Sequence, residues 1–125
     1  MEGVTLAVWG LAFKARTDDL RMSPALEVIG RLLARGARVR AYDPAVGPRP
    51  GDPALAGIEV CADAYGACEG AAVLVVLTEW EDFRRVDLTK VVGLLARPLR
   101  VVDARNLLDP AELRKHGFQY TGIGR

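Results

Sequence analysis

The residues that most invite a chemical role lie in one short stretch near the start of the chain. Lys14, Arg16 and Arg21 stand there together with Asp18 and Asp19, soon after an apolar run over residues 4–9. A lysine supplies a compact charge for a phosphate, and an arginine supplies a planar fork for phosphate or carboxylate. These cations therefore suit an anionic ligand such as a pyrophosphate. A second interpretation is that Asp18 and Asp19 only cap turns and pair with the two arginines.

This region contains only part of the sequence motif of a dinucleotide-binding site. Gly10 ends the first apolar run, but the second and third glycines of the G-x-G-x-x-G fingerprint are missing, so close approach of an NAD pyrophosphate to the backbone is not specified. Asp43 closes a second strand-like segment, where a Rossmann fold carries its ribose-binding acid. Because Pro44 follows it, Asp43 fits turn chemistry equally well. We expect no NAD bound through a fingerprint here.

Two further segments carry polar residues after apolar runs. Arg105 and Asn106 follow residues 100–104, and Trp80 follows residues 71–77. Arg105 would add a further cation for a pyrophosphate, and Asn106 can donate and accept hydrogen bonds at once. Trp80 could stack on a base, or it could seal a core or an interface.

The elements that would position these residues alternate between strands and helices. Strands are predicted over residues 4–9, 38–43, 58–60, 71–77, 100–105 and 118–124. Helices are predicted over residues 24 to about 36, around 62–68, over 86–96 and over 109–117. Ser23 is the expected N-cap of the first helix, which begins with Pro24, and Asp87 is the expected N-cap of the third. This alternation predicts a Rossmann-like, three-layer α/β fold with a mostly parallel, doubly wound sheet of about six strands. Ligands bind such sheets beyond the carboxyl ends of the strands, where all the polar segments above are expected to lie.

Bulk properties exclude several classes of function. The chain has 125 residues and a net charge of +1, which suits one domain and predicts no nucleic-acid or membrane partner. No signal peptide or membrane span is recognised, so we expect a cytoplasmic protein with reduced cysteines. Cys61 and Cys68 do not have the spacing of a zinc site or a redox motif. His116 is the single histidine, and it suits a helix end. No metal site is therefore predicted. Nucleophile-elbow and Walker motifs are absent, and Trp9-Gly10 stands where a phosphoacceptor receiver domain needs acids.

Five linked motifs add a more specific signal. They are residues 10–29 (GLAFKARTDDLRMSPALEVI), 39–44 (VRAYDP), 78–83 (TEWEDF), 101–109 (VVDARNLLD) and 117–125 (GFQYTGIGR). In order and spacing they resemble the C-terminal, UDP-binding domain of the UDP-glucose/GDP-mannose dehydrogenase family, with the best match to UDP-glucose 6-dehydrogenases. The resemblance runs from about residue 4 to the last residue.

The resemblance implies roles for five residues. Phe13 and Lys14 match the substrate-binding Phe-Lys pair of the family, with Lys14 near the diphosphate and sugar. Arg105 and Asn106 fall in a motif whose arginine region contacts the substrate, and Arg21 matches an arginine that reaches towards NAD. No catalytic residue is assigned to this chain.

Two departures from the family pattern bear on these roles. Ala104 replaces the usual glycine before Arg105, which stiffens the turn. Met22 stands where the family commonly has glutamate, which removes a polar contact near the cofactor. The loop over residues 10–21 is then expected to hold a UDP-sugar, with a lysine where the glycines would have been.

The resemblance also implies what this chain lacks. Enzymes of the family oxidise the C6 alcohol of a nucleotide sugar to a carboxylate with NAD, using an N-terminal Rossmann domain and a central helical region that are not found here. We therefore expect residues 1–125 to form a single nucleotide-sugar-binding domain of an NAD-dependent UDP-glucose 6-dehydrogenase, inactive alone and dependent on the missing domains in cis or in trans. The alternative is a stand-alone, non-catalytic interaction module that forms a homodimer through its exposed interdomain face.

Overall fold

The strands of this chain form a single parallel sheet. The computed structural model describes residues 3–12, 20, 23–48 and 51–122. In that part of the chain, six strands form one sheet in the order β3-β2-β1-β4-β5-β6, and each neighbouring pair is parallel. The strands are β1 (Thr5–Trp9), β2 (Arg38–Tyr42), β3 (Ile58–Val60), β4 (Val73–Val76), β5 (Arg100–Asp103) and β6 (Gln119–Gly122). The predicted doubly wound, Rossmann-like sheet is thus confirmed, and its strand order reverses between β1 and β4.

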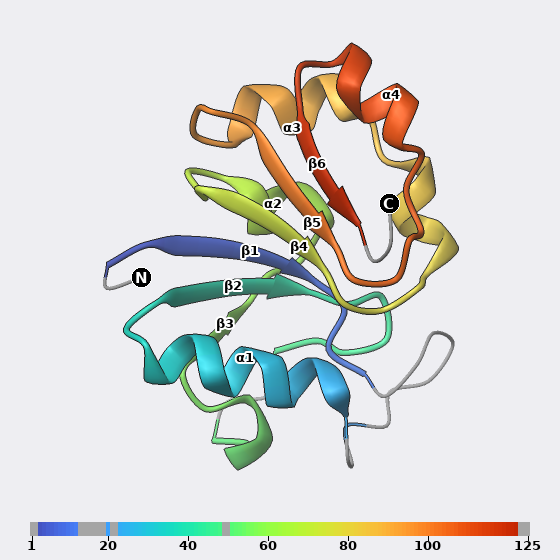
Figure 1. Ribbon diagram of the computed structural model, residues 1–125. Coiled ribbons are helices and arrows are strands. Elements are labelled where there is room, and N and C mark those ends of the chain that lie inside the picture. The colour runs from blue at the N-terminus through green and yellow to red at the C-terminus, as the bar shows by residue number, and fades with distance from the viewer. Residues whose placement is uncertain (1–2, 13–19, 21–22, 49–50, 123–125) are drawn as a thin grey trace.

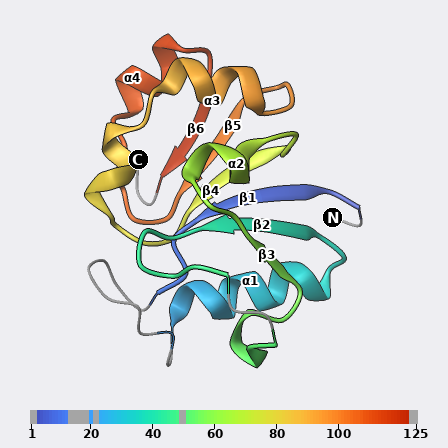
Figure 2. The same cartoon turned by 180° about the vertical axis from the view of Figure 1, so that it is seen from behind.

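Helices cover the two faces of the sheet unequally (Figures 1 and 2). One face carries α1 (Pro24–Ala34), and the other carries α2 (Ala64–Cys68), α3 (Leu88–Leu94) and α4 (Pro110–Lys115). Two short 3₁₀ helices, η1 (Pro53–Leu55) and η2 (Glu81–Arg85), complete the set of elements. No described helix combines the length and the apolar character needed to cross a bilayer.

Local sequence signals set the helix ends. Ser23 caps α1 by accepting a hydrogen bond from the Leu26 amide at 3.4 Å, and Pro24 occupies the first turn. Asp87 and Asp109 cap α3 and α4 in the same way. The caps Ser23 and Asp87 are the ones that the sequence predicts, and Asp109 is a further cap at the start of the predicted helix over 109–117. His116 ends α4, with its Nδ1 2.9 Å from the Glu112 carbonyl oxygen, so the histidine has the predicted helix-end role.

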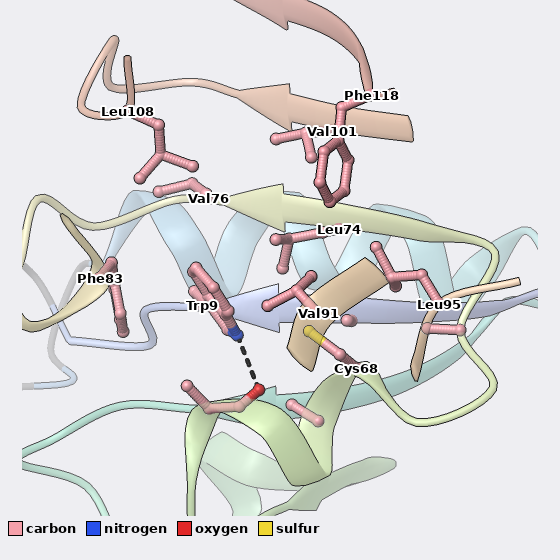
Figure 3. Packing of buried hydrophobic residues seen from close by; sticks show 14 of the residues in the cluster. Trp9, Cys68, Leu74, Val76, Phe83, Val91, Leu95, Val101, Leu108 and Phe118 are labelled. Carbon is pink, nitrogen blue, oxygen red and sulfur yellow. Dashed lines mark hydrogen bonds between the residues drawn. The ribbon is translucent and has the colours of Figure 1, made fainter. Parts of the chain in front are cut away.

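Two hydrophobic clusters hold the layers together. The larger cluster lies between the sheet and α2, α3 and α4, and Figure 3 shows Trp9 at its centre. The indole of Trp9 stacks on Phe83 with ring centroids 5.2 Å apart and donates a hydrogen bond to the Ala64 carbonyl at 3.1 Å. Trp80 is half-buried and packs against this cluster, which supports the core-sealing interpretation. The smaller cluster lies beneath α1 around Val8 and Ile29.

Coverage on the α1 side decreases from the middle of the sheet to its edge. Val8, Val75, Val102 and Thr121 are consecutive partners across β1, β4, β5 and β6. Val8 is fully buried, Val75 is half-buried, and Val102 is 39% exposed. The half of this face formed by β4, β5 and β6 therefore has no helix over it in the described structure (Figure 1).

Gly10 allows β1 and β4 to end very close together. Its φ of 108° is strained for any residue with a side chain, and an added Cβ would collide with Thr78, whose amide nitrogen would lie only 2.6 Å away. The single glycine retained from the fingerprint thus serves strand packing at the switch point.

Candidate functional site

Polar side chains gather at the carboxyl edge of the sheet, as the sequence predicts. The described members of this group are Asp43 after β2, Thr78 and Glu79 after β4, and Arg105 and Asn106 after β5. Since the strands are parallel, all these segments lie at the edge marked by the arrowheads in Figure 1. The reversal of strand order between β1 and β4 places the site at the point where open α/β sheets bind ligands.

Asp43 anchors the base of the loop that follows β1. Its carboxylate is 2% exposed, and Oδ2 accepts hydrogen bonds from the amides of Leu11 at 2.9 Å and Ala12 at 3.0 Å. Oδ1 accepts from the Ala45 amide at 2.8 Å. Both oxygens therefore serve backbone amides, and the structure supports the turn interpretation of Asp43 over ribose binding.

Side chains from two other elements fix the same loop base. Ser23 donates its hydroxyl hydrogen to the Leu11 carbonyl at 2.7 Å, and Thr78 donates to the Ala12 carbonyl at 3.3 Å. The loop that carries the predicted ligand residues thus starts from a backbone held by β2, β4 and the N-cap of α1. Phe13, Lys14 and Arg21 themselves lie outside the described residues, as do Arg16, Asp18, Asp19 and Met22.

Arg105 and Asn106 are on a tight turn after β5. The Arg105 guanidinium is 3.0 Å from the Glu79 carboxylate, and the two side chains are 46% and 49% exposed. Asn106 is half-buried and has a positive φ of 51°, a left-handed conformation that asparagine tolerates better than most residues. The structure thus brings Arg105 beside the segment after β4, a pairing that the sequence does not reveal.

A residue missed by sequence reasoning organises this turn. Asp103 ends β5, is fully buried, and accepts hydrogen bonds from the amides of Arg105 at 3.1 Å and Leu108 at 2.8 Å. Tyr120 donates its hydroxyl hydrogen to the same carboxylate at 2.9 Å. The available signal was the likeness to Asp43, because each acid stands at the carboxyl end of a strand, and both accept from the amide two residues later.

A cleft of about 720 Å³ opens next to the turn. Its apolar lining includes Phe83, Leu108 and Leu113, and Arg84 and Asn106 contribute polar groups. Arg84 also donates a hydrogen bond from Nε to the Leu107 carbonyl at 2.9 Å. Asn106 therefore lies between Arg105 and a partly apolar cleft bounded by η2, α3 and α4.

The two cysteines do not have the character of catalytic nucleophiles. Burial raises the pKa of the Cys68 thiol from 9.0 to about 12, and burial also raises the pKa of Cys61 despite the nearby Arg40. Catalytic thiols have a lowered pKa, so these thiols stay protonated at neutral pH. Among the described residues, no group of three or more His, Cys, Asp or Glu side chains is placed to hold a metal.

The described residues also do not fit an NAD site. The backbone near β1 offers Gly10 without the second and third glycines, and Gly10 packs against Thr78. Asp43, in the position of a ribose-binding acid, is committed to three backbone amides. The fold is Rossmann-like, but the described residues do not present the groups that such folds use for a dinucleotide.

Curated relatives resemble the chain over its whole length. It is 47% identical over 129 aligned residues to a UDP-glucose 6-dehydrogenase of Pseudomonas aeruginosa and 42% identical over 125 residues to one of Rhizobium meliloti. These alignments cover 99% and 100% of the chain but 28% of each relative. The chain thus spans little more than a quarter of the length of the curated relatives it matches.

Solved structures share the fold. An NDP-N-acetyl-D-galactosaminuronic acid dehydrogenase from Methanosarcina mazei superposes with a TM-score of 0.85 at 29% identity, over 99% of this chain and 25% of the other. A UDP-glucose dehydrogenase from Pyrobaculum islandicum superposes with a TM-score of 0.72 at 28% identity, over 98% of this chain and 26% of the other. The family model described as "UDP-glucose/GDP-mannose dehydrogenase family, UDP binding domain" matches residues 7–110. The chain therefore belongs to the UDP-glucose/GDP-mannose dehydrogenase family and corresponds to its UDP-binding domain.

Proposed function

We propose that residues 1–125 form the UDP-sugar-binding domain of an NAD-dependent UDP-glucose 6-dehydrogenase, which converts UDP-glucose to UDP-glucuronate. The observation that carries this proposal is the position of Arg105, which lies on a tightly hydrogen-bonded turn at the carboxyl edge of the sheet. An arginine held in this way offers paired N–H donors to a diphosphate without having to order its own backbone on binding.

The other ligand residues have complementary roles in this proposal. Lys14 adds a second positive charge for the diphosphate, and Phe13 supplies an apolar surface for the nucleotide. Asn106 offers an amide beside Arg105, and Arg21 reaches towards the cofactor held by another domain. The chain itself binds and orients the substrate, and it contributes no group to the oxidation.

A titration followed by NMR tests this function. UDP is added to the isotopically labelled chain, with NAD and GDP as comparison ligands, and backbone amide shifts are recorded. We expect saturable shifts around Lys14 and Arg105 with UDP and none with NAD. A flat response to UDP at millimolar concentration would contradict a uridine-nucleotide site formed by this chain alone.

Two variants locate the site, and a third serves as the control. Lys14→Ala and Arg105→Ala should each weaken UDP binding about 10-fold or more, since each removes a charge-assisted contact. Arg100 lies at the amino end of β5, opposite the carboxyl end after which Arg105 follows, and it is exposed. Arg100→Ala should therefore leave the UDP affinity unchanged. An equal loss in all three variants would indicate nonspecific charge attraction.

We further propose that catalysis requires additional dehydrogenase domains, in cis or in trans. The chain spans 28% of the curated dehydrogenases it matches, and neither cysteine has an activated thiol. The chain alone should form no NADH from UDP-glucose and NAD in an absorbance assay. UDP-glucose-dependent NADH formation by the purified chain would contradict this.

The partly open sheet face is where those domains would pack. Val102 is 39% exposed on the α1 side of β5, where no described helix lies over the sheet. A second candidate function, a stand-alone module that forms a homodimer, would use the same face. Sedimentation of the chain and of Val102→Lys separates the two: a dimer lost in the variant, together with no response to UDP, would favour the interaction module.

A further inference from the structure

The turn that carries Arg105 depends on one buried carboxylate. Oδ1 of Asp103 accepts from the Arg105 amide, and Oδ2 accepts from the Leu108 amide, so the carboxylate spans both ends of the turn. Asp103 is fully buried. A buried carboxylate is stable only when hydrogen bonds replace its lost water, and its donors therefore determine the geometry of the turn.

A third donor to Asp103 comes from a different strand. Tyr120 lies on β6, seventeen positions further along the chain, and its hydroxyl is 2.9 Å from Oδ2. The register pairs Val101 with Tyr120 and Asp103 with Gly122, so the phenol reaches along β6 towards the carboxyl edge. The two amide donors are local to the turn, whereas Tyr120 ties the turn to the neighbouring strand.

Gly122 shows how closely β6 packs on this turn. A Cβ at this position would lie 2.7 Å from Oδ1 of Asn106 and 2.9 Å from the Tyr120 hydroxyl. Both distances are shorter than a methyl carbon tolerates, so a side chain here would displace the Asn106 amide or the Tyr120 phenol. β6 thus closes on the Arg105 turn through Tyr120 at Asp103 and through Gly122 at Asn106.

We propose that Tyr120 is a positioning residue for Arg105. By donating to Asp103, the phenol fixes the carboxylate that holds the backbone of the turn, and this limits the directions in which the Arg105 guanidinium projects. The inference rests on the proposed function, because it makes the C-terminal strand a determinant of diphosphate affinity although Tyr120 itself need not touch the ligand.

Tyr120→Phe tests the inference, first without any ligand. The change keeps the ring and removes the hydroxyl, so Asp103 loses one donor. Amide hydrogen exchange at Arg105 and Leu108 should accelerate about 5-fold or more, and the Arg105 side-chain Nε–H signal should shift or broaden. Unchanged exchange rates together with an unchanged side-chain signal would overturn the proposal, whatever the effect of the substitution on UDP affinity.

A matched control variant is available at a tyrosine whose hydroxyl contacts Asp87 rather than Asp103. The Tyr65 hydroxyl accepts a hydrogen bond from the Asp87 amide at 2.8 Å, in contact between α2 and the start of α3. Tyr65→Phe also removes one tyrosine hydroxyl, but it should leave the Arg105 and Leu108 signals as they are. Equal changes in both variants would identify general loosening of the fold and would also overturn a positioning role.

The effect on ligand binding is measured as a double-mutant cycle with UDP. Tyr120→Phe should weaken UDP binding about 5-fold in the natural sequence and have no further effect in the Arg105→Ala background, because residues that act through one another are not additive. The same weakening of UDP binding, by about 5-fold, in both backgrounds would refute the proposal that Tyr120 acts through Arg105. If the natural chain does not respond to UDP, the proposed function fails, and the ligand-free signals alone decide whether Tyr120 positions Arg105.

Discussion

The guanidinium of Arg105 lies 3.0 Å from the carboxylate of Glu79, across the carboxyl ends of the neighbouring strands β5 and β4. Both side chains are close to half exposed, so water and salt screen their attraction and the pair is worth about 1 kcal/mol or less. In the proposed site, a diphosphate would therefore replace Glu79 at Arg105 at little cost. The pair keeps the arginine near the edge of the sheet while leaving it available.

Glu79→Gln should strengthen UDP binding. The substitution removes the negative charge that competes with the diphosphate for Arg105, and an exposed pair of this strength corresponds to about a 2- to 5-fold gain in affinity. Titration calorimetry or NMR measures it. Glu81→Gln is the control, since Glu81 forms a comparably exposed pair with Arg84 at 3.3 Å. Weaker binding in Glu79→Gln would mean that Glu79 orients Arg105 for the ligand.

Asp43→Asn should destabilise the fold strongly. The buried carboxylate accepts from three backbone amides with its two oxygens, and an asparagine would direct its NH₂ group at one set of these donors. We expect a loss of about 2–4 kcal/mol in the free energy of unfolding, measured by urea denaturation.

Asp63→Asn provides the comparison for this result. Asp63 is an exposed N-cap of α2 that accepts from the Gly66 amide at 2.7 Å, and asparagine caps helices about as well as aspartate. Its cost should be a few tenths of a kcal/mol. Similar costs for both substitutions would show that the Asp43 carboxylate is not specifically required.

Gly10→Ala should also destabilise the protein, for a steric reason. The position has a φ of 108°, and an added Cβ would collide with Thr78, so we expect a cost of about 3 kcal/mol or more from strain and collision together. Gly30→Ala has the opposite expected sign. Gly30 lies in α1 with nothing within 4 Å of its added Cβ, and alanine there should stabilise the helix by about 0.5–1 kcal/mol.

Most of the fold could be predicted because its signals are local. The apolar runs specify strands, and Ser23-Pro24, Asp87 and Asp109 specify helix starts through their own side chains. The 3₁₀ helices η1 and η2 were missed, since pieces of three to five residues show no apolar periodicity. The helix predicted over residues 86–96 spans only Leu88–Leu94, because the backbone is already extended at Leu95.

The location of the candidate site could be predicted from the sequence, but the contacts between its side chains could not. The alternation of strands and helices puts the polar segments at one edge of the sheet, whereas which of them meet depends on strand order. Arg105 and Glu79 are 26 positions apart, and Tyr120 and Asp103 are 17 apart. No local pattern encodes such pairs. Asp103 was missed because an acid at the end of a strand looks like an ordinary turn residue until its burial is known.

The stability of the fold should fall at alkaline pH, in part through Cys68. Burial raises the pKa of this thiol from 9.0 to about 12 in the folded chain. Between about pH 9 and pH 12 the unfolded chain has therefore lost this proton while the folded chain keeps it. Since the unfolded state then binds fewer protons, the free energy of unfolding decreases with rising pH, by at most about 1.4 kcal/mol per pH unit from this group.

Urea denaturation of the natural chain and of Cys68→Ala, at about pH 7, 9 and 10.5 under reducing conditions, isolates this contribution. The variant should be less stable at neutral pH, because it lacks the buried sulfur, but its stability should fall less steeply above pH 9. Some slope should persist in the variant, since burial also raises the pKa values of Tyr42 and Cys61. Parallel pH profiles for the two proteins would mean that Cys68 ionises as readily in the folded chain as in the unfolded one. Cys68 should also react more slowly than Cys61 with an alkylating reagent at about pH 8, because Cys68 is buried and Cys61 is only half-buried.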